Sequence, residues 1–252
     1  MAKVGVMGLG EIASRMVEGL AGQGHAILVS ERSRERSSAL ARKIEEVGVA
    51  ANADVVAGSD IVILALMAGT AREVLPGLPF RAGQRIISVM ADLPLSDLAR
   101  LCAPATDIAI TIPLPFIARG GCPLPVFPES TALLEIFGER NQVRPVASEA
   151  ALNAHFIATA LCSTVLDQLR VGSGWLAGHT GDAAAAEAYV LDLIAGYLGD
   201  LARGEGPGIE GALQALSTPG GLNATLRDHL RAAGLTEALA RGMQGLEGRL
   251  GL

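Results

Sequence analysis

The chain has few of the residues that mark several large classes of protein. Its three cysteines, Cys102, Cys122 and Cys162, lie far apart and form no C-x-x-C pair, so the sequence predicts free thiols of a cytoplasmic protein, no disulfide framework and no metal site. The formal net charge of −6 leaves no basic surface for nucleic acid. The longest apolar runs, such as the seven residues from Ile61 to Met67, are too short to cross a bilayer, so we expect no membrane partner. The first predicted strand begins at Lys3, which leaves no room for a signal peptide.

The composition favours a well-packed protein with buried contacts. Half of the 252 residues are hydrophobic, which is enough for a full core in one or two domains. Charged residues make up only 18% of the chain, a low share for a soluble protein. This shortage of charge indicates buried subunit contacts in addition to a core.

The first 34 residues carry the clearest pattern in the chain. The apolar run Lys3–Met7 leads into Gly8-Leu9-Gly10-Glu11-Ile12-Ala13, then into a helical pattern through Ala21, and a second apolar run follows at 26–29. Gly8 permits a tight turn, Gly10 lets the backbone approach a pyrophosphate, and Ala13 lets the helix pack closely on the strand. Free N–H groups at the start of that helix attract negative charge. The order predicts a dinucleotide-binding βαβ unit.

The tip of the second predicted strand selects the form of the dinucleotide. An acidic residue there would accept a hydrogen bond from the ribose 2′-hydroxyl of NAD. Here a single acidic residue, Glu31, is surrounded by Ser30, Arg32, Ser33 and Arg34. Guanidinium groups make bidentate, charged contacts with phosphate, so this tip favours the 2′-phosphate of NADP(H) over NAD.

Strands and helices alternate through residues 1–147. Apolar runs predict strands at 61–65, 85–89 and 107–111, and the patterns between them predict helices at 35–47, 52–58, 70–75 and 131–137. Asn52 is expected to cap the second of these helices. Five prolines in residues 112–128 predict irregular or edge-like chain. The alternation predicts an α/β fold with a doubly wound, mostly parallel sheet, in which Ala65, Leu66 and Met67 complete the coenzyme site.

Residues 148–252 are predicted to form an all-helical domain. Ser148 is expected to cap a long helix from Glu149 towards Arg170, and Asp182 to cap a second one over 183–202. Glycines are expected to break the first helix at 172, 174 and 178, and to form a loop with Pro207 at 204, 206 and 208. Further helices are expected at 209–216, 221–233 and 235–249.

The predicted helix at 183–202 is apolar around most of its surface. Such a helix must be buried on most sides, which a small helical domain can hardly arrange alone. The sequence therefore predicts a subunit interface and a homodimer or larger assembly. The alternative is a central core helix of the monomer.

A second glycine-containing turn precedes a helix at 217–223. Ser217, Thr218, Gly220, Gly221 and Asn223 offer hydroxyl groups, an amide and unobstructed N–H groups at a helix start, an arrangement that suits a substrate carboxylate. The alternative is simple punctuation between two helices, since proline and glycine often mark turns.

These segments together resemble the pyrroline-5-carboxylate reductase family. The resemblance rests on Gly8–Ala13, the tip Ser30–Arg34 and the stretch Leu216–Leu230, and it extends in order and length over nearly the whole chain. It implies an N-terminal Rossmann domain and a C-terminal helical domain that dimerises. The family's S-P-G-G-x-T stretch, which holds the substrate carboxylate, corresponds to Thr218–Asn223 here.

The chain departs from this family in its substrate half. The family's Lys-Pro after the fourth strand is Met67-Ala68, its Met-Pro-Asn-Thr-Pro run is Thr111–Pro115, and its Gly-Ser-Gly-Pro stretch is replaced near Ala158–Thr164. Hydride transfer from a nicotinamide depends on placement more than on a strong acid. The candidates for a catalytic proton donor are His155, Ser163 and Thr164.

The leading hypothesis is an NADPH-dependent reductase of the C=N bond of a small cyclic imine that carries a carboxylate. The departures leave three alternatives open. The chain could reduce another imine or a ketone, it could bind NADP without catalysis, or it could exchange hydride between NADP and a flavin-type carrier.

Overall fold

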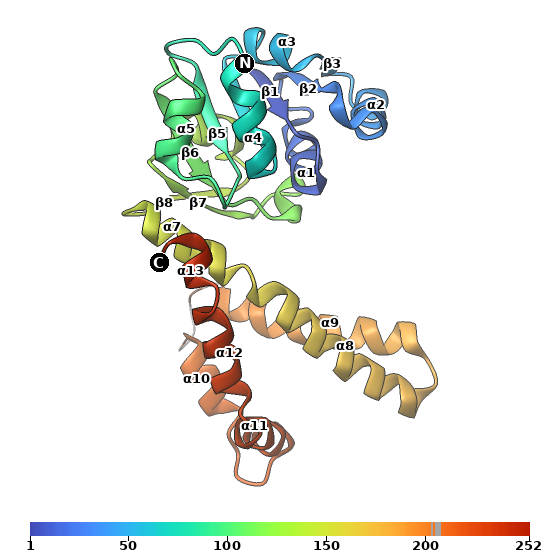
Figure 1. Ribbon diagram of the computed structural model, residues 1–252. Helices are drawn as coiled ribbons and strands as arrows, with labels where there is room; N and C mark the ends of the chain where they lie inside the picture. Colours follow the sequence, from blue (N-terminus) through green and yellow to red (C-terminus); the bar gives the residue numbers. More distant parts are fainter. Residues whose placement is uncertain (203, 205–207) are drawn as a thin grey trace. The chain divides into compact units, whose positions relative to one another are not determined.

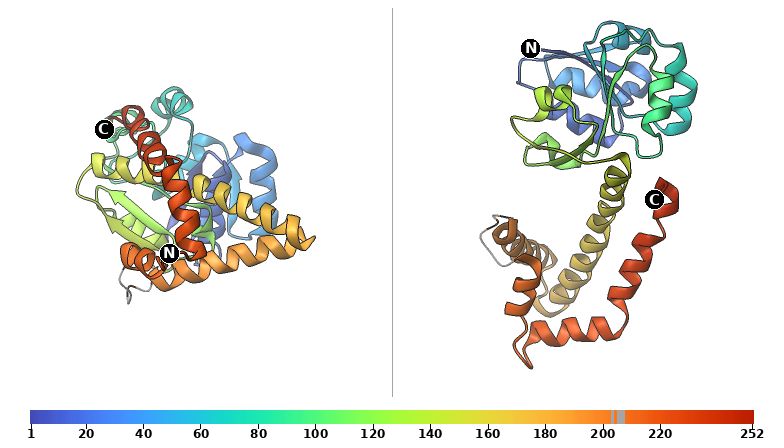
Figure 2. Two further views of the ribbon diagram at one scale, coloured as in Figure 1. Left: turned by 90° about the horizontal axis from the view of Figure 1, so that it is seen from below. Right: turned by 90° about the vertical axis from the view of Figure 1, so that its left-hand side faces the viewer.

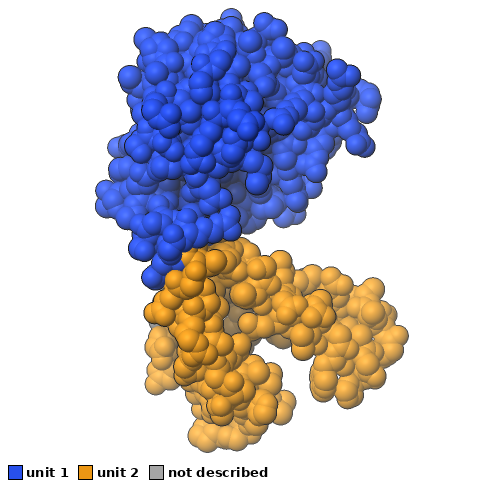
Figure 3. Space-filling view, viewed as in Figure 1, with its two compact units in different colours: residues 1–156, 247–252 blue, residues 157–246 orange. Residues whose placement is uncertain are grey.

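The computed structural model describes residues 1–202, 204 and 208–252. The chain divides into two compact units, of which unit 1 contains residues 1–156 and 247–252 and unit 2 contains residues 157–246 (Figure 3). The sequence places the boundary after residue 147. The observed division instead assigns residues 148–156 and the C-terminal residues 247–252 to unit 1.

Unit 1 is built on one eight-stranded sheet (Figure 1). The strands are β1 (Lys3–Met7), β2 (Ala26–Ser30), β3 (Val47–Ala50), β4 (Ile61–Leu64), β5 (Arg85–Ser88), β6 (Asp107–Thr111), β7 (Pro123–Phe127) and β8 (Gln142–Pro145). They lie in the order β3-β2-β1-β4-β5-β6-β7-β8, and every neighbouring pair is parallel except β6 with β7. The strand order reverses beside β1, and open sheets of this kind bind ligands at that switch point.

Helices cover both faces of this sheet, as the two views of Figure 2 show. The helices over the two faces are α1 (Glu11–Leu20), α2 (Arg34–Lys43), α3 (Asn52–Ala57), α4 (Ala68–Val74), α5 (Leu95–Leu101) and α6 (Thr131–Phe137). The further helices are α7 (Glu149–Ala158) and α13 (Glu247–Leu250), and the 3-10 turns are η1 (Glu31–Ser33), η2 (Leu75–Gly77) and η3 (Pro115–Ala118). Side chains alternate along each strand, so Val6 and Ile63 join the cluster under α1, α2 and α6, whereas Met7 and Leu64 join the cluster under α3, α4 and α5. The predicted doubly wound, mostly parallel fold is confirmed.

Three strands were not predicted. The helix expected at 35–47 ends at Lys43, and β3 begins at Val47, because Val47 to Ala50 pair in parallel with β2. Asn52 is the first residue of α3 and does not cap it.

The proline-rich stretch, expected to be irregular or edge-like, contains β7, and β8 follows it. Leu124 and Val126 are buried at alternate positions of β7, which places its prolines on the other face, and β7 has a strand on each side. Core burial thus outweighs the low strand preference of proline.

Unit 2 consists of α8 (Leu161–Thr180), α9 (Ala183–Ala202), α10 (Gly208–Ala215), α11 (Leu222–Ala232) and α12 (Leu235–Gln244). Helices α8 and α9 pack side by side (Figure 1). Asp182 accepts a hydrogen bond from the backbone N–H of Ala185 at 3.0 Å, and Ser148 accepts one from Ala151 at 3.0 Å, so both predicted caps are confirmed.

The helix boundaries in this half differ from the prediction at several places. The long helix from Glu149 is divided by a turn at 159–160, and α8 then passes through the glycines at 172, 174 and 178 to end at Gly181, whose φ is +76°. Packing against α9 offsets the low helix preference of those glycines. The final helix is split into α12 and α13, Gly208 begins α10, and Gly206 and Pro207 lie outside the described residues.

Helix α9 is exposed in the single chain. Only Ala186 is buried among residues 183–202, all of which the structure describes, so the alternative of a monomer core helix is wrong. The stretch Glu149–Thr180 is also long and apolar enough to cross a membrane by length and composition alone, since an 18-residue window within it has a mean hydropathy of 1.2. The longest uninterrupted apolar run does not reveal this stretch, because a single polar residue interrupts such a run but hardly lowers the mean hydropathy of a window. One such stretch is weak evidence for a membrane protein.

Candidate functional site

The glycine-rich turn between β1 and α1 is the centre of the candidate site. Gly8 has φ +85°, and a Cβ there would lie 2.3 Å from the carbonyl oxygen of Ala65, so only glycine fits. A Cβ on Gly10 would meet nothing within 4 Å, because this residue faces open space at the start of α1. Ala13 is 1% exposed and packs in the core. The turn therefore leaves a free approach to the N–H groups that begin α1.

Ser30 supports this turn from beneath. Its side chain is 2% exposed, and its hydroxyl accepts a hydrogen bond from the N–H of Gly8 at 3.2 Å. The sequence suggests Ser30 as a coenzyme ligand. In the structure this hydroxyl instead holds the glycine turn in place.

A cavity of about 620 Å³ opens above the turn. It is lined by Gly8, Leu9, Gly10, Arg32, Ser33, Arg34, Glu35, Arg36, Ala65, Leu66, Met67 and Thr70. Nine of the predicted coenzyme residues thus come together, from the ends of β1, β2 and β4. Glu11 lies in a neighbouring groove, and Ile12 is half-buried and packs against the core.

Three residues of this cavity, Glu35, Arg36 and Thr70, were not predicted from the sequence. Arg36 lies on the first turn of α2, and its Nη1 is 3.5 Å from the carbonyl oxygen of Leu9. Arginine at every second position, Arg32, Arg34 and Arg36, could have indicated it, since the 3-10 turn η1 brings this segment round the cavity mouth.

A smaller cavity of about 300 Å³ adjoins the same arginines. It is lined by Glu31, Arg32, Arg34 and Asn52, the last of which comes from the start of α3. Asn52 was also missed as a site residue. It reaches the site only because β3 pairs beside β2.

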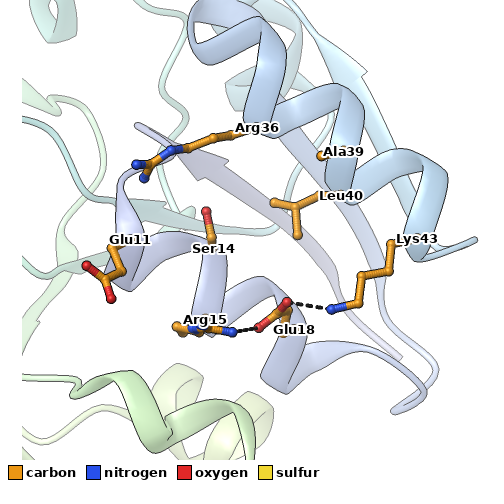
Figure 4. A pocket seen from close by; sticks show the side chains of 8 residues that line it. All are labelled: Glu11, Ser14, Arg15, Glu18, Arg36, Ala39, Leu40 and Lys43. Carbon is orange, nitrogen blue, oxygen red and sulfur yellow. Dashed lines mark hydrogen bonds and ion pairs between the residues drawn. The ribbon is translucent and has the colours of Figure 1, made fainter.

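A third cavity, a groove of about 340 Å³ between α1 and α2, contains a cluster of three ion-paired side chains (Figure 4). Glu18 binds Arg15 at 2.7 Å and Lys43 at 2.8 Å. Hydrogen bonds from Lys43 and then Arg15 lower the pKa of Glu18 below its ordinary value. Glu18 pairs with both cations, and its ion pair with Lys43 links α1 to α2. These side chains therefore stabilise the packing of the two helices.

The turn at 217–221 in unit 2 is held by a guanidinium group. Arg227 Nη1 donates to Ser217 Oγ at 2.6 Å and to the carbonyl oxygen of Leu213 at 3.3 Å, and the Ser217 hydroxyl donates to the same carbonyl at 2.6 Å. Ser217 is thereby engaged within the protein.

Two of the other predicted substrate residues on this turn are joined by a backbone contact, in which the N–H of Gly221 donates to the carbonyl oxygen of Thr218 at 2.9 Å. Thr218, Gly220 and Asn223 are exposed, and Gly220 has φ +72° with nothing within 4 Å of a built Cβ. Gly221 is constrained, since its Cβ would lie 3.0 Å from the carbonyl oxygen of Thr218.

The three candidate proton donors are all exposed. His155 Nδ1 lies 2.7 Å from the carbonyl oxygen of Ala151, while the hydroxyls of Ser163 and Thr164 donate to carbonyls of their own helix at 3.1 and 2.9 Å. His155 belongs to unit 1 and the other two to unit 2. Their local contacts do not single out one of them.

Two of the three cysteines, Cys102 and Cys122, are buried, and Cys162 is exposed. Burial raises the pKa of the Cys102 thiol to about 12, so it stays protonated. Among the described residues, no group of three or more histidine, cysteine, aspartate or glutamate side chains is placed to hold a metal ion.

Comparison with known proteins agrees with this geometry. Residues 3–92 match the family described as NADP oxidoreductase, coenzyme F420-dependent, which supports the prediction of NADP(H). The whole chain superposes on 1-pyrroline-5-carboxylate reductase from Streptococcus pyogenes with a TM-score of 0.84, at 20% identity over 100% of this chain and 99% of that one. The fold is that of the pyrroline-5-carboxylate reductases.

Two further solved structures extend the comparison. Plasmodium falciparum pyrroline carboxylate reductase with NADP bound has a TM-score of 0.84, at 15% identity over 99% of this chain and 97% of that one. A reductive aminase from Aspergillus terreus in complex with NADPH4, cyclohexanone and allyl amine has a TM-score of 0.61, at 20% identity over 99% and 95%. A search of curated proteins by sequence gave no match. The resemblance stated from the sequence is thus confirmed for the fold.

Proposed function

We propose that the chain is an NADPH-dependent oxidoreductase that reduces the C=N bond of a small cyclic imine carrying a carboxylate. The observation that carries this proposal is the cavity of about 620 Å³, where a glycine turn meets Arg32, Arg34 and Arg36. The family match to residues 3–92 and the shared reductase fold support it.

The residues of this cavity fit a dinucleotide with a 2′-phosphate. The open space above Gly10 would receive the pyrophosphate against the start of α1, and the arginines would hold the 2′-phosphate. NADPH, when bound, supplies the hydride. The chain's own residues would bind the adenine half at β2 and direct the other half along the sheet edge towards β4 and β5.

The turn at 217–223 is proposed to receive the substrate carboxylate. Thr218, Gly220 and Asn223 are exposed there, and α11 begins at Leu222. A protonated imine is already electrophilic, and hydride transfer to it gives the neutral amine without a further proton. His155, Ser163 or Thr164 would then act by hydrogen bonding near the substrate nitrogen.

We also propose that unit 2 joins two copies of the chain. Large apolar side chains of α8 and α9 are exposed in the single chain, among them Val165, Leu166, Val171, Trp175, Tyr189, Leu191, Leu193, Tyr197 and Leu198. An exposed apolar surface of this kind marks an interaction site. Light scattering should show a dimer or larger assembly that Leu198→Glu weakens and Leu134→Glu, on α6 of unit 1, does not. The three free thiols agree with a cytoplasmic location.

The decisive experiment for the function has two stages. The first is calorimetric titration with NADPH and with NADH, in which we expect tighter binding of NADPH and in which no heat with either would overturn the proposal. The second follows NADPH oxidation with pyrroline-5-carboxylate, other cyclic imines, ketones and a deazaflavin acceptor.

Each outcome of the second stage selects one alternative. Turnover of pyrroline-5-carboxylate supports the imine reductase. Turnover of a ketone alone, or of the deazaflavin alone, would assign the function to that substrate. The family description names coenzyme F420. Binding without consumption of any of them would indicate a non-catalytic NADP-binding protein.

A further inference from the structure

The end of the chain belongs to unit 1, although the residues before it belong to unit 2. The chain leaves unit 1 after Phe156 and returns to it at Glu247. Residues 247–252 are called the C-terminal clasp below. A segment that returns over such a sequence distance must be held by specific contacts, since its ordering costs entropy.

Two sets of polar contacts hold the clasp. Arg249 makes a two-pronged ion pair with Asp92, with Nε and Nη2 at 3.2 and 3.0 Å from the two carboxylate oxygens. Asn153 Nδ2 donates to the carbonyl oxygen of Leu250 at 2.8 Å. The clasp is thus tied both to the loop after β5 and to α7.

The clasp forms one wall of a cavity of about 250 Å³ in unit 1. The other walls are the loop 90–94, Ile110 of β6 and the face of α7 that carries Glu149, Asn153 and Phe156. Glu149 accepts a hydrogen bond from the N–H of Leu95 at 2.8 Å, so α7 also holds the end of that loop. The loop is therefore fixed at Asp92 by the clasp and at Leu95 by α7.

The position of this loop connects it with the coenzyme cavity. Leu64 at the end of β4 pairs with Ser88 at the end of β5. Leu66 and Met90 each come two residues after these paired positions. Leu66 lines the coenzyme cavity and Met90 lines the clasp cavity, after the next strand along the sheet edge. A coenzyme whose adenine half lies at β2 extends in this direction.

We propose that the C-terminal clasp, latched by Arg249 on Asp92, immobilises the loop 89–94 and so sets the wall beside the reacting end of the coenzyme. Arg249 is then a positioning residue, and its effect on catalysis rests on the proposed function. Both side chains of the Arg249–Asp92 ion pair are partly exposed, so dissolved salt weakens the pair and little free energy is needed to break it.

The test compares wild type, Arg249→Ala, the charge swap Asp92→Arg with Arg249→Asp, and Arg241→Ala as an exposed arginine control on α12. Amide hydrogen exchange in residues 89–95 reports the loop directly. Binding of 2′,5′-ADP reports the adenine half of the site. Steady-state kinetics with the imine separates kcat from KM.

We expect faster exchange of the loop in Arg249→Ala by about 3-fold, the size of effect typical of an exposed ion pair. We expect kcat to fall by about 3-fold and 2′,5′-ADP affinity to stay unchanged, because misplacement of a reacting group slows catalysis. The charge swap should restore both readouts, and Arg241→Ala should resemble wild type. Added sodium chloride should speed loop exchange in wild type and not in Arg249→Ala.

If the loop amides of Arg249→Ala exchange as slowly as those of wild type, the proposal that the clasp immobilises the loop is wrong. Faster exchange with unchanged kcat would overturn its role in positioning, as would a loss that the charge swap does not restore. If wild type reduces no imine, the proposed function fails, while the exchange measurement still decides whether the clasp holds the loop.

Discussion

The hydroxyl of Ser30 accepts a hydrogen bond from the backbone N–H of Gly8 at 3.2 Å and joins the tip of β2 to the glycine turn after β1. Ser30 is 2% exposed, so its substitution by alanine would leave the partly buried N–H of Gly8 without this partner. We expect Ser30→Ala to lower the free energy of unfolding by about 1–3 kcal/mol, measured by urea denaturation. The affinities for NADPH and NADH should fall by the same factor, because the pyrophosphate is common to both.

Ser33 is the matched control for this prediction. It lines the coenzyme cavity. Ser33→Ala should leave stability unchanged and lower the NADPH affinity more than the NADH affinity. A Ser30→Ala protein as stable as wild type would contradict the supporting role of Ser30.

Arg36 provides a test of the coenzyme assignment at a residue that the sequence did not indicate. Removal of a charged hydrogen bond of about 1.5–3 kcal/mol should weaken NADPH by about 10-fold or more in Arg36→Ala and in Arg32→Ala, while NADH binding stays nearly unchanged. Arg42→Ala, an exposed position at the other end of α2, should bind both coenzymes as wild type does. If the affinities for NADPH and NADH fall by the same factor, these arginines do not bind the 2′-phosphate.

Gly220 tests the proposed carboxylate site. In Gly220→Val the side chain would meet no protein atom within 4 Å of its Cβ, but the φ of +72° adds strain of about 1–2 kcal/mol. We expect KM for the imine to rise by about 10-fold with NADPH affinity unchanged, because the new side chain fills the space proposed for the carboxylate.

Gly181→Val separates strain from ligand contact. Gly181 has φ +76° and likewise nothing within 4 Å, but it ends α8. Gly181→Val should lose about as much stability as Gly220→Val, and its KM for the imine should equal that of wild type. If NADPH affinity falls in Gly220→Val, the turn has another role.

Glu18 makes the stability of unit 1 depend on pH. Lys43 and Arg15 lower its pKa, so the ionised form is favoured in the folded state and contributes stability above the ordinary carboxyl value of 4.5. Glu18→Gln should lose about 1 kcal/mol at pH 7, and the difference from wild type should shrink as pH falls through the lowered pKa. Urea unfolding at several pH values checks this, with the exposed Glu45→Gln as control. A difference that stays constant with pH would exclude the ion pairs as its source.

The chain sequence by itself determined the coenzyme half of the protein. Gly8 to Ala13 and Arg32 to Arg34 are contiguous segments, so the turn and the charge at the tip of a strand follow from local chemistry. The caps at Ser148 and Asp182 were predictable for the same reason. Each depends on residues within one or two turns of chain.

Only the tertiary structure decided which distant residues meet. It recruited Arg36, Thr70 and Asn52 to the site, gave Ser30 a supporting role, and made a strand of the proline-rich Pro123–Phe127. It also brought Arg249 to Asp92 across the length of the chain. These outcomes depend on strand pairing and burial between distant segments, whose free energies no local pattern contains.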